Sequence, residues 1–337
     1  MFRNYGPKIP YKSYYRDGIM RTDSYKMACV FGGTGFIGRQ IVRALAKEGY
    51  TIKVATRVPE SAYFLRTCGN VGQIVPFTCN YNDESSIRAS VKGCEVVVNC
   101  VGALYEKGKS SFTRVHTEFP RAIAKACTAE KVGRFIHISA GGCDESHSKY
   151  GKSKLNGEMA AAENFPSVTV LRPSVVFGAE DNFFNMFARL SLLLPALPLI
   201  GGGATKFQPV YVGDIALAVV AALHDGSTAG KTFSLGGPEV LTFKEIYGLI
   251  FKETGRKRCL FPLPWGIAKI QGGLMGLLPS PLLTADQVES LKTDNIVPVG
   301  AAGFEALGIV PTGPEAVLPS YLARYRPGGR FGDKKRA

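Results

Sequence analysis

The sequence contains no uninterrupted run of about 20 apolar residues, the length that a helix needs to cross a membrane. Two apolar stretches that could approach a membrane, residues 190–200 and 260–283, are both interrupted by prolines, and the longest proline-free part of the second has 14 residues. The 260–283 stretch could therefore lie flat in a bilayer interface or against a hydrophobic partner, or form an ordinary buried helix.

Histidine and tryptophan are scarce, with four residues and one, and the eight cysteines form no C-x-x-C pair. No histidine has the spacing of a metal ligand, so we expect no bound metal. Cys29 and Cys100 lie in apolar runs where a thiol packs as a small hydrophobic group, which favours free thiols in a reducing compartment. His137 alternates with Phe135 and Ser139 and is expected to be a packed strand residue.

Acidic residues are in deficit, because 27 aspartates and glutamates face 41 lysines and arginines, a net charge of +14. Residues 1–26 carry +4 and residues 324–337 carry +5, so most of the excess lies in two tails. A nucleic-acid-binding protein usually carries its basic residues as a stripe on the folded surface, so we expect no nucleic acid partner. The tails favour docking onto an acidic protein face or anionic lipid, although solvated tails explain them equally well.

Short apolar runs alternate with amphipathic stretches up to Pro173. Strands are predicted at 27–32, 51–56, 73–77, 95–102, 134–140 and 167–173, and helices at 36–48, after Pro59, and at 83–91, 113–131 and 149–164. Strands that alternate with helices of this length form right-handed crossovers and a parallel sheet. The predicted fold class is α/β, a Rossmann-type doubly wound parallel sheet with a smaller irregular α-rich C-terminal lobe.

The pattern loosens after Pro173. Helices are predicted at 181–193, 213–224, 242–254, 265–276, 284–291 and 313–325, and short strands near 208–212 and 231–235. Thr242 and Glu245 form a capping box, and Asp214 is expected to cap its own helix. The predicted units are a basic N-terminal extension (1–26), a nucleotide-binding domain (27–178), a C-terminal lobe that partly returns to the sheet (179–323), and a basic tail (324–337).

A glycine-rich turn follows the first predicted strand and opens a helix. Residues 32–38 read GGTGFIG and satisfy G-x-x-G-x-x-G. Glycines at these positions allow a tight turn and a close approach of backbone N–H groups to a pyrophosphate. We therefore predict a dinucleotide site that includes the whole turn: Gly32, Thr34, Gly35, Phe36, Ile37 and Gly38.

The end of the second strand indicates which dinucleotide binds. An NAD site places an acid there to accept from the ribose 2′-hydroxyl, but this chain has Arg57 and no acid before Glu60. Arg39, directly after the glycines, is a second guanidinium near that corner. Because a guanidinium pairs with phosphate oxygens, the two arginines favour a 2′-phosphate and hence NADPH.

Tyr150 and Lys154 form a Y-x-x-x-K pair at the start of a predicted helix, where residues four apart share a face. Lys154 could lower the pKa of the Tyr150 phenol and bind the nicotinamide ribose, while Ser139, at the end of strand five, orients a carbonyl oxygen. The ends of strands four and six complete the candidate cofactor site, with Cys100, Val101, Gly102 and Pro173.

Four segments in this order, at 32–38, 97–102, 135–140 and 150–154, resemble the short-chain dehydrogenase/reductase superfamily over roughly residues 26–240. Longer segments, including YGKSKLNGE, LRPSVVFGAEDNFFNMFA and QPVYVGDIA, are similar to one atypical branch of it. That branch is the family of reductase-like, NADPH-binding accessory subunits of respiratory complex I.

The resemblance implies that NADPH is a structural cofactor without turnover. It also implies that the partners are other complex I subunits, in the peripheral arm near the junction with the membrane arm. The location would be the matrix side of the mitochondrial inner membrane, or the cytoplasmic face of a bacterial membrane. The implied phosphate contacts are Gly32, Gly35, Gly38, Arg39 and Arg57, and the implied ribose contacts are Tyr150 and Lys154.

Two features depart from the superfamily pattern. Ser139 precedes Tyr150 by only 11 residues, so Ser146 or Ser148 could take its place, and Asn80 stands where an acid often binds adenine. An active NADPH-dependent reductase or epimerase, with Tyr150 as proton donor or acceptor, is the alternative function. A third is a binding module that senses the ratio of NADPH to NADP+.

Overall fold

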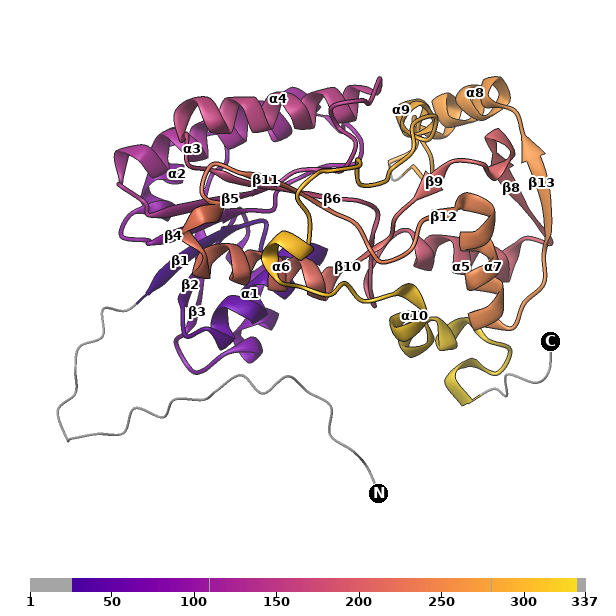
Figure 1. Ribbon diagram of the computed structural model, residues 1–337, viewed down its shortest axis with the longest axis horizontal. Helices are drawn as coiled ribbons and strands as arrows, with labels where there is room; N and C mark the ends of the chain where they lie inside the picture. Colours follow the sequence, from indigo (N-terminus) through magenta and orange to yellow (C-terminus); the bar gives the residue numbers. More distant parts are fainter. Residues whose placement is uncertain (1–25, 109, 280, 332–337) are drawn as a thin grey trace.

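The computed structural model describes residues 26–108, 110–279 and 281–331 (Figure 1). One part is a seven-stranded sheet with helices on both faces, and the other is a smaller, mostly helical lobe. The predictions for residues 1–25 and 332–337, which cover much of both basic tails, lie outside the described residues. The domain boundaries stay predictions.

All seven strands of the main sheet run parallel, in the order β11-β6-β5-β4-β1-β2-β3. They are β1 (Met27–Phe31), β2 (Thr51–Thr56), β3 (Ile74–Thr78), β4 (Val96–Asn99), β5 (Arg134–Ile138), β6 (Thr169–Pro173) and β11 (Thr232–Leu235). The order reverses between β1 and β4, which opens a crevice at the carboxyl ends of the strands. The predicted Rossmann-type sheet is confirmed.

Alternate residues of β1 point into two separate cores, as the period of a strand requires. Ala28 and Val30 join the core beneath one pair of helices, and Cys29 and Phe31 join the core beneath the other three. The pair is α1 (Phe36–Lys47) and α6 (Val212–His224), and the three are α2 (Glu84–Val91), α3 (Phe119–Ala129) and α4 (Lys149–Asn164). This double cover explains why the strands are almost continuously apolar.

Two predicted helices take other forms. The segment after Pro59 is a 3₁₀ helix, η1 (Pro59–Cys68), and the predicted helix at 113–131 begins as a π-helix, η2 (Thr113–Glu118), before α3. Pro120, which has no N–H to donate, lies where the π-helical turn passes into α3. The π-helical turn carries the buried His116.

The smaller lobe packs around its own aromatic core. Its helices are α5 (Phe184–Leu193), α7 (Phe243–Thr254), α8 (Trp265–Met275), α9 (Ala285–Ser290) and α10 (Pro314–Leu322). Its strand pairs are β7 (Val176–Phe177) with β10 (Val210–Tyr211), β9 (Lys206–Phe207) with β12 (Leu241–Thr242), and β8 (Ala196–Ile200) with β13 (Cys259–Leu263). The parallel β8–β13 pair was not predicted, because prolines interrupt both apolar runs.

The apolar stretch at 260–283 is not a single element. Its first residues belong to β13, α8 follows Pro264, and the chain then leads to α9. Within the described ranges, the structure contains no helix of the length and hydropathy that a membrane span requires. The helix predicted at 265–276 is confirmed as α8, but the interpretation of it as an ordinary buried helix is wrong, because Ile267, Ile270 and Leu274 are exposed.

The chain returns to the main sheet after α9 and then goes back to the smaller lobe at α10 (Figure 1). Ser234 of β11 donates its N–H to Ala302 O at 2.8 Å, and Phe304 is buried in the core beneath α1 and α6. Further on, Thr312 donates its N–H and its hydroxyl to the Asp214 carboxylate at 2.6 and 3.0 Å. The prediction that Asp214 caps α6 is wrong, since Tyr211 is the N-cap, whereas the capping box of Thr242 and Glu245 is confirmed.

Candidate functional site

The glycine loop between β1 and α1 closes tightly on itself and on the end of β4. Gly32 has a φ of +74°, and a side chain there would meet the Cys100 carbonyl carbon at 3.0 Å. A Cβ on Gly38 would lie 2.1 Å from Gly32 O, so only glycine fits this turn. The helix that follows has no side-chain N-cap and no acid in its first turn, which leaves its positive end suited to an anion.

A cleft of about 190 Å³ lies at this end of the sheet, where the strand order reverses. It brings together seven of the predicted cofactor residues: Gly32, Thr34, Gly35, Arg57, Cys100, Val101 and Gly102. Phe36 turns instead toward Gly178, Ile37 packs on the core, and Pro173 is buried at the end of β6. Thr56 and Tyr81 also line the cleft and were not predicted.

Tyr81 forms part of the cleft wall next to the ends of β2 and β3. Its hydroxyl donates to Ala55 O at 2.8 Å, its ring stacks on Phe119 with centroids 4.4 Å apart, and the Arg57 guanidinium lies 5.8 Å above it. Asn80, which drew attention in the sequence, accepts from the Asn82 N–H and shapes a turn. The aromatic residue directly after Asn80 was the signal that the sequence analysis missed.

The two predicted phosphate arginines are placed differently. Arg39 donates Nε to Gly35 O at 3.2 Å and Nη2 to Thr34 O at 2.9 Å, and its Nη1 pairs with Glu180 at 2.9 Å. Its guanidinium therefore fixes the shape of the loop. Arg57 is exposed beside the cleft and, within the described ranges, makes no ion pair.

Lys154 lies below the cleft floor. Its Nζ donates to Ile138 O at 3.0 Å and lies 3.9 Å from the position that a Cβ on Gly102 would take. Burial lowers the pKa of Lys154 to about 8, against the opposing effects of Glu158, Cys143 and Cys100.

Tyr150 does not show the predicted activation. Burial, aided by the Cys143 thiol, raises the pKa of Tyr150 to about 12, and the lysine is not among the causes of that shift. The prediction that Lys154 lowers this pKa is therefore wrong for this structure. The two side chains still share one face of α4, as their spacing requires.

The structure distinguishes the three candidate serines, Ser139, Ser146 and Ser148, by their hydrogen bonds. Ser148 caps α4 by accepting from the Gly151 N–H at 3.0 Å, and Ser146 lies within hydrogen-bond distance of Ser148. Ser139 is buried at the end of β5, and its hydroxyl has no partner in the described part of the chain. Ser139 is thus the serine of the three that remains available to a ligand.

His116 joins the cleft to the Tyr150 helix and was not predicted. Its Nε2 accepts from the Ala103 N–H at 2.9 Å, so its Nδ1 carries the proton that Ser153 Oγ accepts at 2.8 Å. The imidazole also lies edge-to-face against the Tyr150 ring, with centroids 5.3 Å apart. Burial and the Lys154 charge lower the pKa of His116 to about 3, so the ring is neutral. A π-helical turn, which often marks functional sites, could have signalled it only if the sequence had revealed that turn.

Comparisons with known proteins agree with this geometry. Residues 28–236 match the NAD dependent epimerase/dehydratase family. NADH dehydrogenase (ubiquinone) 1 alpha subcomplex subunit 9, mitochondrial, of Arabidopsis thaliana is 36% identical over 316 residues, which are 90% of this chain and 79% of that protein. The Mus musculus protein of the same name is 36% identical over 304 residues, 89% of this chain and 80% of its own length.

This chain belongs to the complex I alpha subcomplex subunit 9 family. The NADH-ubiquinone oxidoreductase 40 kDa subunit, mitochondrial, of Neurospora crassa is another relative, 34% identical over 301 residues, 89% of this chain and 79% of that protein. Among solved structures, an NADPH-dependent quinone oxidoreductase of Escherichia coli has a TM-score of 0.70 at 19% identity, covering 88% of this chain and 98% of that one. That likeness shows the shared fold.

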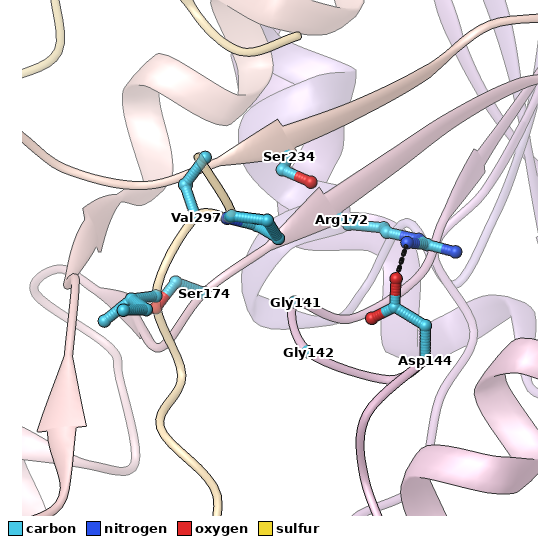
Figure 2. Close-up of a pocket in the computed structure, with 9 residues that line it drawn as sticks. Gly141, Gly142, Asp144, Arg172, Ser174, Ser234 and Val297 are labelled. Carbon is cyan, nitrogen blue, oxygen red and sulfur yellow. Dashed lines mark hydrogen bonds and ion pairs between the residues drawn. The ribbon is translucent and has the colours of Figure 1, made fainter. Parts of the chain in front are cut away.

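In this subunit 9 family member, an ionic cluster lies under the carboxyl ends of β5 and β6. The Arg172 guanidinium donates to the buried Glu158 carboxylate at 2.8 to 3.1 Å. It also donates to Asp144 at 2.7 Å (Figure 2). Cys143 donates its thiol to the same glutamate at 3.3 Å. These bonds satisfy the cluster internally, which indicates a structural role.

Cysteine and histidine side chains in the described ranges form no disulfide and no metal cluster. All eight cysteines of this subunit 9 family member are free. His137 is buried in β5, and its Nδ1 lies 3.1 Å from the Asn99 amide nitrogen, which confirms it as a packed strand residue. No group of three or more metal-ligating side chains occurs in the described ranges.

Proposed function

We propose that the chain is the NADPH-holding accessory subunit of respiratory complex I and keeps the nucleotide as a structural cofactor. The observation that carries the proposal is a cleft at the strand-order switch that exposes an arginine, Arg57, where an NAD site needs a carboxylate. The unpartnered Ser139 hydroxyl and the uncapped start of α1 fit a bound dinucleotide in the same place.

Different residues of the chain bind different parts of the nucleotide. The glycine loop and the α1 N-terminus bind the pyrophosphate, Arg57 binds the 2′-phosphate, and Arg39 holds the loop in shape. Cys100, Val101 and Gly102 line the way to Tyr150 and Lys154, which bind the nicotinamide ribose. NADPH supplies a transferable hydride when bound, but the raised Tyr150 pKa works against proton transfer there at neutral pH.

A bound nucleotide can stabilise the folded chain even if it takes part in no reaction. A ligand that binds only the folded state stabilises that state by about 4 kcal/mol when its free concentration is ~1,000 times its Kd. Here it would tie β1, β2 and β4 together across the switch point. We therefore propose that NADPH supports assembly or stability of the peripheral arm, near the membrane arm.

The surface of α8 supports a location at the membrane. Ile267, Ile270 and Leu274 are 56%, 69% and 67% exposed along one side of α8, whereas Ala268 is buried on the other. Helix α8 itself lies at the end of the molecule away from β3 (Figure 1). We propose that it contacts lipid or an adjoining complex I subunit on the matrix side of the inner membrane.

The test is to isolate the full chain gently and identify its nucleotide by native mass spectrometry. We expect NADPH in the wild type, and a Kd for NADPH about 10-fold or more higher in Arg57→Gln with that for NADH unchanged, the value of a lost charge-assisted contact. Lys53→Gln, which removes the cation of the half-buried Lys53, whose Nζ donates to Lys92 O at 2.7 Å, is the matched control. An unphosphorylated dinucleotide, or a protein that never migrates with a membrane-bound NADH:quinone oxidoreductase, would reject the proposal.

An active reductase or epimerase is the second candidate, favoured by the intact Tyr150, Lys154 and Ser139. Purified protein would then oxidise NADPH over a panel of small carbonyl compounds, and Tyr150→Phe would abolish that turnover. Absence of turnover on the whole panel, with NADPH bound, supports the structural role.

A further inference from the structure

A short strap covers the carboxyl ends of β5 and β6, beside the nucleotide cleft. The strap is residues 294–298, which follow α9 and cross the edge of the sheet before the chain reaches Ala302 and Phe304. Carboxyl ends of parallel strands are where ligands of such folds bind, so the strap stands where a second reactant would approach.

The Asn295 side chain fastens the strap to both strand ends. Its Nδ2 donates to Gly141 O at 2.9 Å, and its Oδ1 accepts from the Val175 N–H at 2.9 Å and from Ser174 Oγ at 2.5 Å. One amide therefore bridges the residues that follow β5 and the residues that follow β6. A planar amide with one acceptor and two donors suits this bridge, and aspartate does not, because it lacks the donor to Gly141.

Backbone bonds anchor the strap on its other side. Asn295 donates its N–H to Lys206 O at 2.8 Å, and its carbonyl accepts from the Gln208 N–H at 3.0 Å. The Gln208 side chain in turn accepts from the Val297 N–H at 2.9 Å. The strap is thus held between the smaller lobe and the main sheet.

Little space remains beneath it. The cavity lined by Gly141, Arg172, Ser174, Val297 and their neighbours has a volume of about 10 Å³ (Figure 2). Such a volume holds about one water molecule. Ser139, the unpartnered serine, lies two residues before Gly141, so the strap adjoins the end of the site where the nicotinamide is proposed to lie.

We infer that the strap is a built-in plug that takes the place of a second reactant, and that Asn295 is the residue that latches it over the reactive end of the bound nucleotide. The inference rests on the proposed NADPH site and deepens it. The plug explains how a reductase-like cleft keeps its nucleotide from being consumed: nothing but water fits between Gly141 and Val297.

The first measurement uses the full chain with NADPH bound and acrylamide as a quencher of nicotinamide fluorescence. We expect the quenching constant to rise about threefold or more in Asn295→Ala as the plug opens toward solvent, and to stay at the wild-type value in Val299→Ala. Val299 is fully exposed on the chain just beyond the strap and makes the control. Equal quenching in Asn295→Ala and wild type would overturn the plug.

The second measurement needs no nucleotide. The Val175 amide donates to the Asn295 side chain, whereas the neighbouring Ser174 amide donates to Leu235 O. The hydrogen-exchange rate at Val175 therefore reports on the Asn295 bond, and the rate at Ser174 is the internal reference. Asn295→Ala should speed exchange at Val175 by about fivefold, the equivalent of one typical hydrogen bond, and change Ser174 less. Unchanged exchange at Val175 overturns the latch even if NADPH binds.

The two arms separate the two proposals. If the wild type binds no NADPH, the proposed function fails while exchange at Val175 still decides the latch. If Asn295→Ala does not fold, Asn295→Asp serves the quenching measurement alone, since it loses the donor to Gly141 but keeps the acceptor for the Val175 N–H.

Discussion

The two halves of the carboxyl edge of the main sheet differ although the same parallel strands build both. Over β1, β2 and β4 the edge opens into a cleft of about 190 Å³, shaped by a glycine loop that only glycines can form. Over β5 and β6 the edge is covered by residues 294–298, and the remaining cavity has about 10 Å³. The same parallel strands therefore carry an open half and a covered half, and the residues that cover the second half come from far along the chain.

Gly38→Ala should have the largest effect and break the open half. The added Cβ would lie 2.1 Å from Gly32 O, so the loop must shift, and we expect the Kd for NADPH to rise by more than about 100-fold. Titration calorimetry measures it. Gly248→Ala adds the same methyl group to an exposed, open position of α7 and should instead stabilise the fold by about 0.5–1 kcal/mol, with affinity unchanged. Equal affinities in both variants would show that the loop does not form the site.

Arg172→Met should break the closed half. It leaves the Glu158 carboxylate buried without its cation, and we expect a loss of about 3 kcal/mol in the free energy of unfolding by urea. Lys252→Met removes an ion pair to Glu315 whose side chains are both 60% exposed, and it should lower the free energy of unfolding far less than Arg172→Met does, because solvent screens the pair. Similar losses in the two variants would mean that the cluster under the strap is not structural.

His116→Gln should change how the free energy of unfolding depends on pH in the acid range. The pKa of His116 is about 3 in the folded chain and near 6.5 when unfolded, so the unfolded state takes up a proton first as the pH falls. The contribution of His116 to the free energy of unfolding is therefore complete above pH 6.5. Below pH 6.5 it declines by at most about 1.4 kcal/mol per pH unit. The variant should show a shallower decline in urea unfolding between pH 6.5 and 4.

Some decline remains in that variant because burial also lowers the pKa of His137. His147→Gln, at an exposed position, should keep the wild-type slope. An unaltered slope in His116→Gln would contradict the neutral, buried state of that ring.

Lys154→Met should give the smallest effect, at alkaline pH. The pKa of Lys154 is about 8 in the folded chain and 10.5 unfolded, so the folded state releases its proton first and its stability rises with pH between 8 and 10.5. Relative to the variant, the wild type should gain at most about 1.4 kcal/mol per pH unit. Measurements are best confined to pH 8–10, because the raised pKa of Tyr150 has the opposite effect above 10. Parallel stability curves would contradict the buried lysine.

Local patterns predicted the repeating part of the fold well. The period of two in β1 and the alternation of strands and helices depend on which residues can be buried, and that information lies in neighbouring residues. The glycine loop was likewise readable because each glycine relieves a contact within a few residues or with the adjacent strand. Three features depend on residues that meet only after the chain has folded. They are the position of Tyr81 in the cleft wall, the hydrogen bonds of His116 to Ala103 and Ser153, and the pairing of β8 with β13.

The sequence alone determined the order of strands and helices and the glycine-rich turn at 32–38. It also determined the absence of an acid directly after β2 and the placement of Tyr150 and Lys154 on one helical face. Only the tertiary structure decided that Arg39 bonds its own loop, that the Ser139 hydroxyl has no partner among the residues the structure describes, and that Asn295 crosses to the ends of β5 and β6. The physical reason is the range of the forces concerned. Periodicity and backbone sterics act between neighbours in the chain, whereas hydrogen bonds between residues 120 to 154 positions apart require the whole sheet to be in place.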